Sequence, residues 1–340
     1  MKAKIQGGYD HVRQKLADIV PIDAPFSVFL ASTQTCNFRC FYCTHSRREK
    51  ENIHLHTVHM ADHLFHQIVK QLQEFPKVGR ILFTGLGEPL ANPKIADMVQ
   101  ELKQAGVTDR IEIVTNASLL THDMTDRLLQ AGLTYLRISL QGLSAEKYQQ
   151  VAGVSIDFEK FVENIRYFYQ KKGDCKLYIK IMDACLDTPE EEQQFYDMFG
   201  DISDLVFVEH IVKAQPQMIG QYGEQVTSEQ TFFREPAEIR QVCPFAFYTL
   251  QVDAEGNVFP CPPLGLPADF SLGNVRDTSL RDIWLGKELY DLQMEHLQGG
   301  RSRNAVCAQC ENYLCFTPKE DNLDQSTQEI QKRLEARGHV

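Results

Sequence analysis

Three cysteines lie within eight positions of one another in the stretch TQTCNFRCFYCTHS. The Cys-x3-Cys-x2-Cys spacing of Cys36, Cys40 and Cys43 allows a tight loop to direct three thiolates toward one compact cluster. Thiolate sulfur is the ligand of iron–sulfur clusters, and three ligands leave one iron of a four-iron cluster open to a cosubstrate. A structural zinc site is the alternative, because His45 can supply a fourth ligand.

Composition favours metal binding over disulfide bonding. The chain of 340 residues has ten cysteines and a net charge of -11, and its start has no apolar segment followed by a cleavage site. Thiols stay reduced in the cytoplasm, which is where we expect this protein. No run of eighteen apolar residues predicts a membrane span, and the negative charge argues against nucleic acid as a partner.

Apolar runs typical of strands alternate with amphipathic segments typical of helices. This alternation predicts an α/β fold with a parallel sheet and right-handed crossovers. In such sheets the ligand binds at the carboxyl ends of the strands. The expected strands are 26–33, 80–85, 110–116, 134–140, 175–183 and 204–212.

The cysteine loop after the first expected strand resembles the signature of the radical S-adenosylmethionine (radical SAM) enzymes, with Tyr42 as the aromatic residue before the last cysteine. The resemblance covers about residues 27–212 and implies a partial (β/α)6 TIM-like barrel. It also implies a [4Fe-4S] cluster whose open iron binds S-adenosylmethionine (SAM). Electron transfer to SAM then releases a 5′-deoxyadenosyl radical that abstracts a substrate hydrogen.

Later strand ends also resemble the family. FTGLGEP is similar to the Gly-Gly-Glu-Pro motif that holds the SAM amino group, although Leu86 replaces its first glycine. IVTNA and SLQG are similar to the motifs of the next two strands. The SAM contacts that the resemblance implies, beside Tyr42, are Gly85, Gly87, Glu88, Pro89, Asn116, Ser139, Gln141 and Asp183.

The C-terminal cysteines resemble the SPASM or twitch extension of radical SAM enzymes, a small loop-rich β-hairpin and helix domain around an auxiliary [4Fe-4S] cluster. Cys243, Cys261, Cys307 and Cys310 are its implied ligands, and Cys315 is an alternative to Cys310. A four-cysteine zinc ribbon is the competing interpretation. One auxiliary cluster is expected, because a full SPASM domain carries more cysteines.

These patterns predict five parts of the chain. They are an N-terminal helical leader (1–25), the barrel (26–212), a linker (213–240), the auxiliary cluster domain (241–316) and a C-terminal tail (317–340). We expect the leader of about 25 residues to be too short for a separate peptide-binding domain before the first strand. A small molecule is therefore favoured over a peptide as substrate.

The resemblance predicts an oxidoreductase that oxidises an alcohol carbon of a sugar, nucleotide sugar or aminocyclitol, with flavodoxin or ferredoxin as electron donor. Glu209, His210 and Lys180 are candidate groups for removing the substrate proton. Two alternatives stay open. One is modification of a peptide or protein, and the other is epimerisation with Cys315 as hydrogen donor.

Overall fold

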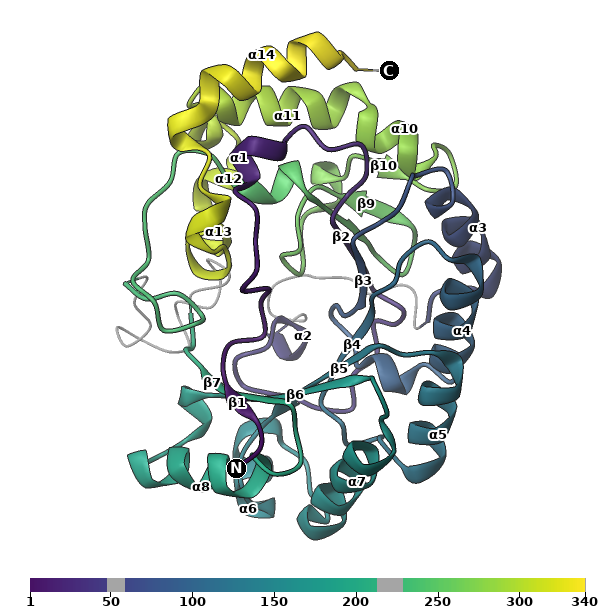
Figure 1. The fold of residues 1–340 in the computed structure, drawn as a ribbon, viewed down its shortest axis with the longest axis vertical. Coiled ribbons are helices and arrows are strands. Elements are labelled where there is room, and N and C mark those ends of the chain that lie inside the picture. The colour runs from purple at the N-terminus through teal and green to yellow at the C-terminus, as the bar shows by residue number, and fades with distance from the viewer. Residues whose placement is uncertain (48–58, 213–228, 340) are drawn as a thin grey trace. The chain divides into compact units, whose positions relative to one another are not determined.

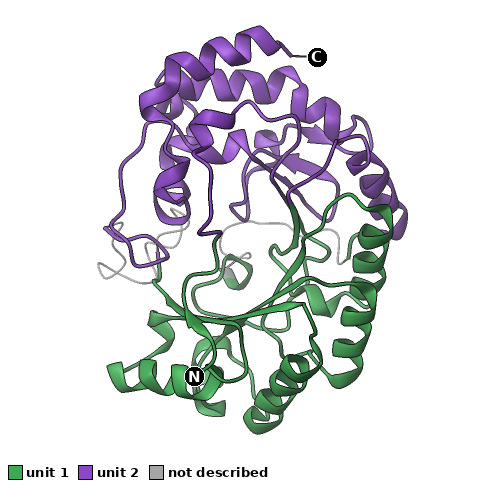
Figure 2. Cartoon of the chain, viewed as in Figure 1, with its two compact units in different colours: residues 1–9, 30–60, 80–211 green, residues 10–29, 61–79, 212–340 purple. Residues whose placement is uncertain are grey.

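The computed structural model describes residues 1–47, 59–212 and 229–339, which form two compact units (Figure 2). Unit 1 comprises residues 1–9, 30–60 and 80–211, and unit 2 comprises residues 10–29, 61–79 and 212–340. Figure 1 labels their helices and strands. The strands are β1 (Lys4–Ile5), β2 (Ser27–Leu30), β3 (Arg80–Phe83), β4 (Ile111–Thr115), β5 (Tyr135–Leu140), β6 (Lys176–Met182), β7 (Leu205–Glu209), β8 (Thr249–Val252), β9 (Asn257–Phe259) and β10 (Gly273–Asn274).

Helices follow most of the strands in unit 1 and occupy the C-terminal part of unit 2. Those of unit 1 are α2 (Thr44–Arg47), α4 (Ile95–Ala105), α5 (His122–Ala131), α6 (Ala145–Ala152), α7 (Phe158–Lys171) and α8 (Pro189–Phe199). Those of unit 2 are α1 (Leu16–Ile19), α3 (Asp62–Leu72), α10 (Leu280–Leu285), α11 (Lys287–Leu297), α12 (Ala305–Gln309), α13 (Asn312–Phe316) and α14 (Thr327–Arg337).

Unit 1 is built on a parallel sheet in the order β1-β7-β6-β5-β4-β3. Leu30, the last residue of β2, accepts a hydrogen bond from the backbone N–H of Thr84 just after β3 (3.0 Å). The expected α/β fold with a parallel sheet core is confirmed, and the six predicted strands correspond to β2 through β7.

The two faces of this sheet differ in chemistry because successive side chains of a strand point to opposite faces. One face is apolar, and its register joins Ile113, Leu136 and Leu177 across three strands. The other face carries polar and charged residues, and its register joins Ser139 to Lys180. We call this second face the polar face; it includes Glu112, Tyr135, Arg137, Ser139, Tyr178, Lys180 and Glu209.

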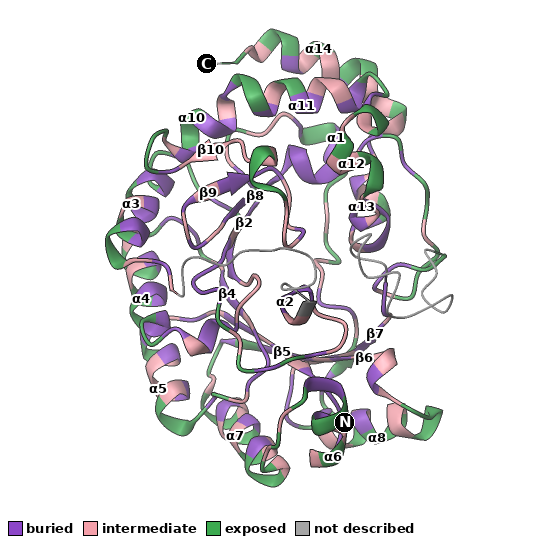
Figure 3. Ribbon diagram, turned by 180° about the vertical axis from the view of Figure 1, so that it is seen from behind, coloured by how far each residue is buried: buried purple, intermediate pink, exposed green. Residues whose placement is uncertain are grey.

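The helices of unit 1 are amphipathic, with one buried side and one exposed side. Ile95, Val99 and Leu102 of α4 are buried at helical spacing, and Figure 3 shows α4, α5 and α7 buried along one side and exposed along the other. Side-chain caps start several of these helices. Thr121 accepts from the N–H of Met124 at α5, and Ser144 accepts from the N–H of Lys147 at α6.

Unit 2 contains the hairpin of β8 and β9, with β10 antiparallel to β9. Two glutamine side chains of α3, Gln67 and Gln71, donate hydrogen bonds to the carbonyl of Val275 (2.7 and 2.8 Å). Gln71 also accepts from the N–H of Leu280 (3.1 Å). Helix α3 therefore packs with the C-terminal segment, although at least 204 positions separate these partners in the chain.

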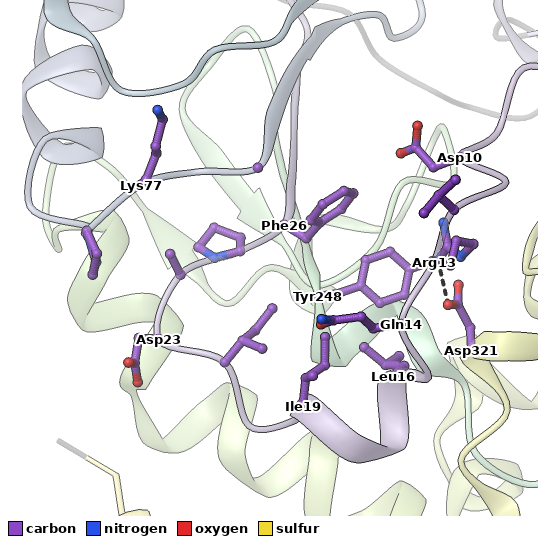
Figure 4. A pocket seen from close by; sticks show the side chains of 16 residues that line it. Asp10, Arg13, Gln14, Leu16, Ile19, Asp23, Phe26, Lys77, Tyr248 and Asp321 are labelled. Atoms are coloured by element: carbon purple, nitrogen blue, oxygen red, sulfur yellow. Dashed lines mark hydrogen bonds and ion pairs between the residues drawn. The ribbon is translucent and has the colours of Figure 1, made fainter.

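A cavity of about 640 Å³ lies in unit 2. Figure 4 shows the rings of Phe26 and Tyr248 among its aliphatic side chains, with the Arg13–Asp321 ion pair (2.5 Å) at one side. Its walls include residues 24–26 together with Pro76, Lys77 and Gly79, which precede β2 and β3. The cysteine loop and the Gly85–Pro89 segment instead follow these strands, so the cavity uses other residues than the predicted active site.

The N-terminal segment differs from the expected helix. Residues 4–5 form β1 beside β7, and α1 is a single turn over Leu16–Ile19. The sequence here has no sustained helical repeat, and tertiary pairing decides its conformation. The expected boundaries also differ from the compact units, because residues 10–29 and 61–79 belong with the C-terminal segment. Much of the expected linker, 213–228, lies outside the described residues.

Candidate active site and cluster-binding residues

The cysteine loop is anchored through its backbone to the C-terminal end of α6. The N–H of Arg39 donates to the carbonyl of Ala152 (2.9 Å), and the N–H of Phe41 donates to that of Val151 (3.0 Å). The Arg39 guanidinium also donates to the carbonyl of Cys36 (2.9 Å). None of these contacts uses a thiol, and the Cys36 sulfur accepts one backbone hydrogen bond, from the N–H of Phe38 (3.4 Å).

The thiols of this loop are close enough to affect one another. Burial is the main cause that raises the pKa of Cys36 to about 11; the N–H of Phe38 opposes the shift, and the nearby Glu88 and Cys43 contribute to it. Burial also raises the pKa of Cys40, with Cys43 and Cys36 as the next causes. Within residues 1–47, 59–212 and 229–339, no three His, Cys, Asp or Glu side chains converge tightly enough to ligate a single ion. A cluster is larger than one ion, and the mutual effect of these thiols fits it.

The Gly85–Pro89 segment lies directly against the chain that leads into the cysteine loop. The N–H of Glu88 donates to the carbonyl of Thr35 (2.8 Å). A Cβ atom on Gly87 would lie 2.4 Å from the carbonyl oxygen of Thr33 and 2.8 Å from that of Thr35. Glycine is therefore required at position 87, and the two segments are held together by backbone.

Glu88 is buried, and both of its carboxylate oxygens accept hydrogen bonds. One oxygen accepts from the Thr115 hydroxyl (2.5 Å) and the N–H of Leu90 (3.0 Å), and the other from the N–H of Asn116 (2.7 Å). Burial raises the pKa of Glu88, although these donors oppose the shift. The carboxylate thus joins the end of β4 to the segment after β3. Thr115 was not predicted as its partner.

Two further contacts hold the cysteine loop to strand ends. The Tyr42 hydroxyl donates to the side-chain carbonyl of Gln141, whose amide donates to the carbonyl of Ser139 (3.0 Å). The Asn116 amide donates to the side-chain carbonyl of Asn37 in the loop (3.0 Å). The predicted SAM contacts Tyr42, Asn116 and Gln141 therefore have partners within the chain, and they gather around the cysteine loop.

Lys180, Glu209 and Tyr178 form a cluster on the polar face. Lys180 donates to one Glu209 oxygen (2.6 Å), and the Tyr178 hydroxyl donates to the other (2.9 Å). Glu209 is buried, whereas 16% of the Lys180 side chain is exposed. Burial raises the pKa of Glu209 despite the opposing charge of Lys180. Lys180 is in register with Ser139 on β5, so the cluster lies next to a predicted SAM contact.

Asp183 and His210 pair one residue beyond the ends of β6 and β7. The His210 Nδ1 atom lies 2.6 Å from Asp183 Oδ2, and Asp183 Oδ1 accepts from the N–H groups of Ala184 and Ile211 (2.8 and 2.9 Å). This carboxylate clamps the two strand ends together. Both residues lie beyond the strands, and Asp183 begins a short 3-10 turn (Asp183–Cys185), so the alternation that defines the polar face does not extend to them.

The auxiliary cysteines also affect one another. Burial raises the pKa values of Cys243 and Cys261, and the thiols of Cys307 and Cys310 raise both further. Burial raises the pKa of Cys307 to about 12, with Cys310 as the next cause. All four are partly exposed, whereas Cys315 is fully buried in α13. The structure therefore brings together the four residues that the sequence predicted as ligands.

Comparison with known protein families identifies both parts of the chain. Residues 30–191 match the radical SAM superfamily, and residues 243–311 match the iron–sulfur cluster-binding SPASM domain. The chain is a radical SAM enzyme with a C-terminal SPASM domain. Radical SAM domains bind SAM on a [4Fe-4S] cluster, and SPASM domains bind auxiliary iron–sulfur clusters. The predicted kinds of cofactor are therefore confirmed.

Characterised relatives differ in their substrates. The tungsten-containing aldehyde ferredoxin oxidoreductase cofactor-modifying protein of Pyrococcus furiosus is 27% identical over 76% of this chain and 80% of its own length. The dTDP-4-amino-4,6-dideoxy-D-glucose ammonia-lyase of Streptomyces venezuelae is 28% identical over 53% of this chain but only 36% of its own length.

Solved structures share the fold at low identity. SuiB of Streptococcus suis, bound to the precursor peptide SuiA, has a TM-score of 0.64 at 16% identity, covering 88% of this chain and 73% of SuiB. BtrN in complex with AdoMet and 2-DOIA has a TM-score of 0.53 at 18% identity, covering 87% of this chain and 96% of BtrN. Across the described residues, no helix is long and apolar enough to cross a membrane.

Proposed function

We propose that this enzyme oxidises an alcohol carbon of a small polyhydroxylated substrate, a sugar, nucleotide sugar or aminocyclitol. The Lys180–Glu209 pair on the polar face is the observation that carries this proposal. A charged, hydrogen-bonding surface beside the predicted SAM contact Ser139 suits hydroxyl groups better than an apolar substrate. The aminosugar nucleotide substrate in the name of the Streptomyces relative supports the same class.

In this proposal Cys36, Cys40 and Cys43 hold the cluster that binds SAM. The bound cofactors supply the 5′-deoxyadenosyl radical and an acceptor for one electron. Gly85, Gly87 and Pro89 present backbone groups to the methionyl part of SAM, and Glu88 fixes that backbone through its three donors. Asn116, Ser139 and Asp183 are the remaining predicted contacts, and Tyr42 and Gln141 hold the loop in place.

The Lys180–Glu209 pair removes the substrate proton. After hydrogen abstraction, an alcohol carbon radical becomes a ketone when it loses one proton and one electron. Lys180, the more exposed member, accepts the hydroxyl proton while it passes its own proton to Glu209 across 2.6 Å. The raised pKa of Glu209 favours its protonated form at the end of this transfer. Asp183 and His210 act as positioning residues in this scheme.

Substitution of Lys180 by methionine tests this assignment. The assay uses the reconstituted enzyme with SAM, dithionite and a panel that includes dTDP-4-amino-4,6-dideoxy-D-glucose and an aminocyclitol. The expected product is two hydrogens lighter than the substrate. Lys180→Met should still form 5′-deoxyadenosine but lose about 100-fold or more of the ketone product, which is the usual contribution of a general base.

Lys176→Met is the matched control, because Lys176 lies on the same strand with an exposed side chain. It should keep the activity of the unchanged enzyme. Full ketone formation by Lys180→Met would refute the role of the pair. If none of the panel compounds increases 5′-deoxyadenosine formation above the rate without substrate, the proposed substrate class is refuted.

Peptide modification is the second candidate, supported by the fold shared with SuiB in its peptide-bound state. Peptides bearing serine or cysteine in the same panel would reveal it by substrate-dependent 5′-deoxyadenosine formation. Redox-neutral epimerisation would instead place solvent deuterium on carbon without loss of mass. The full burial of Cys315 argues against its role as the hydrogen donor.

A further inference from the structure

The Cys307-x2-Cys310 turn is held by an arginine that the sequence analysis did not select. The guanidinium of Arg301 donates to the carbonyl of Cys307 (2.7 Å) and lies 3.5 Å from that of Cys310. The same group donates to the Tyr313 hydroxyl (3.0 Å) and lies over the Tyr313 ring, 4.2 Å from its centre. Three contacts and the ring thus fix one cation beside two predicted cluster ligands.

A second side chain reaches a ligand sulfur directly. The amide of Asn312 donates toward the Sγ atom of Cys310 (3.5 Å), and Asn312 is buried. Asn304 completes the setting from the other side, because its side chain accepts from the N–H groups of Val306 and Cys307. The predicted ligands Cys307 and Cys310 are therefore ordered by polar groups that are not themselves ligands.

We infer that Arg301 and Asn312 order the Cys307–Cys310 turn and set the reduction potential of the auxiliary cluster. A four-iron cluster with four thiolates is anionic, and reduction adds another negative charge. A fixed cation nearby and an N–H···S hydrogen bond both stabilise the reduced form more than the oxidised form, so they raise the potential. In the proposed reaction this favours electron acceptance from the substrate radical. The inference rests on the proposed ligand assignment.

The test isolates the auxiliary site in the full-length chain. Alanine at Cys36, Cys40 and Cys43 removes the first cluster, so reconstituted protein should hold about four irons from one auxiliary cluster. Into this background we would introduce Arg301→Gln, Arg301→Lys and Asn312→Leu. Arg303→Gln is the matched control, because Arg303 is two residues away, 66% exposed and 3.7 Å from its partner Glu295.

The first measurement is the midpoint potential, from a dithionite titration followed by electron paramagnetic resonance. Arg301→Gln and Asn312→Leu should shift the midpoint to more negative values, and Arg303→Gln should leave it unchanged. Arg301→Lys keeps the charge and should shift it less than Arg301→Gln. A merely structural role would not move the potential of the iron that remains bound.

The second measurement is iron release to a chelator, which also serves if Arg301→Gln holds too little iron to titrate. In Arg301→Lys the single ammonium group cannot reach both partners that the two guanidinium nitrogens contact. Loss of one charged hydrogen bond corresponds to about tenfold faster iron release. Midpoints and release rates equal to those of Arg303→Gln in all three variants would overturn the inference. Absence of iron from the background itself would instead reject the ligand assignment.

Discussion

Alanine at position 87 would place a methyl group where the backbone of a neighbouring segment already lies. The nearest atoms to the new Cβ are the carbonyl oxygens of Thr33 and Thr35, at 2.4 and 2.8 Å. Neither atom belongs to a side chain that can rotate away. The segment Gly85–Pro89 must therefore move away from the start of the cysteine loop, and the hydrogen bond from Glu88 to Thr35 is the first to be lost.

The size of the effect follows from the cost of forcing extra volume into a packed site, about 1–3 kcal/mol. In the proposed site SAM binding requires both segments at once, because one carries the predicted cluster ligands and the other the predicted contacts to the methionyl group. If the strain falls on that arrangement, the dissociation constant of SAM should rise by about 5- to 160-fold. Isothermal titration of SAM into the reconstituted Gly87→Ala variant measures this directly.

Gly106→Ala is the matched control. Gly106 ends α4 with a φ of +66°, and a Cβ there would meet no atom within 4 Å. Alanine at this position costs about 1–2 kcal/mol of backbone strain without touching either segment. Both variants should therefore unfold at lower temperature, but only Gly87→Ala should bind SAM more weakly. Equal SAM affinity in the two variants would refute the reasoning.

Three other predictions concern buried polar groups and ligand choice. Burial alone would raise the pKa of Glu112, but Arg137, Arg80 and Arg110 together lower it. The ionised Glu112 therefore stabilises the fold fully above its unfolded pKa of about 4.3. This stabilisation is lost as the pH falls through the lower pKa of the folded state. Urea unfolding should show Glu112→Gln less stable than the unchanged protein by about 3–5 kcal/mol at pH 7, with a smaller difference at pH 3; equal stability at pH 7 would contradict this. Cys310→Ala should reduce the iron content from about eight to about four per chain, while Cys315→Ala should leave it near eight, and the reverse pattern would make Cys315 the fourth ligand. Tyr42→Phe removes the hydrogen bond to Gln141 and should lower the free energy of unfolding by about 0.5–1.5 kcal/mol, measured by urea titration against Tyr169→Phe, which changes a tyrosine outside the cysteine loop.

The strands of unit 1 were predictable because each is a short apolar run between turn signals and amphipathic helices. β1 was not, because a two-residue strand of Lys4 and Ile5 has no pattern of its own and exists through pairing with β7. The grouping of α3 with the C-terminal segment was also hidden. It depends on Gln67 and Gln71, whose spacing on a helix predicts only a polar contact, without its partner.

Cys36, Cys40 and Cys43 could be predicted as cluster ligands because their spacing is local, whereas the residues that support their loop are distant in the chain. Thr115 reaches Glu88 across 27 positions, and Tyr42 reaches Gln141 across 99. Arg301 is closer to its partners in the sequence, but its side chain could adopt many orientations beside a cysteine turn. The carbonyls that it contacts carry no signal in the sequence. Its role follows only from the folded geometry.

The buried Glu88 carboxylate connects the end of β4 to the segment that leads into the cysteine loop. Thr115 and Asn116 donate to the side chain of Glu88, and the backbone of Glu88 donates to Thr35, next to Cys36. This path joins β4 through Glu88 to the residue before Cys36, which is a predicted cluster ligand. A carboxylate with three donors has little freedom to turn, so in the proposed site Glu88 would fix the backbone of its own segment.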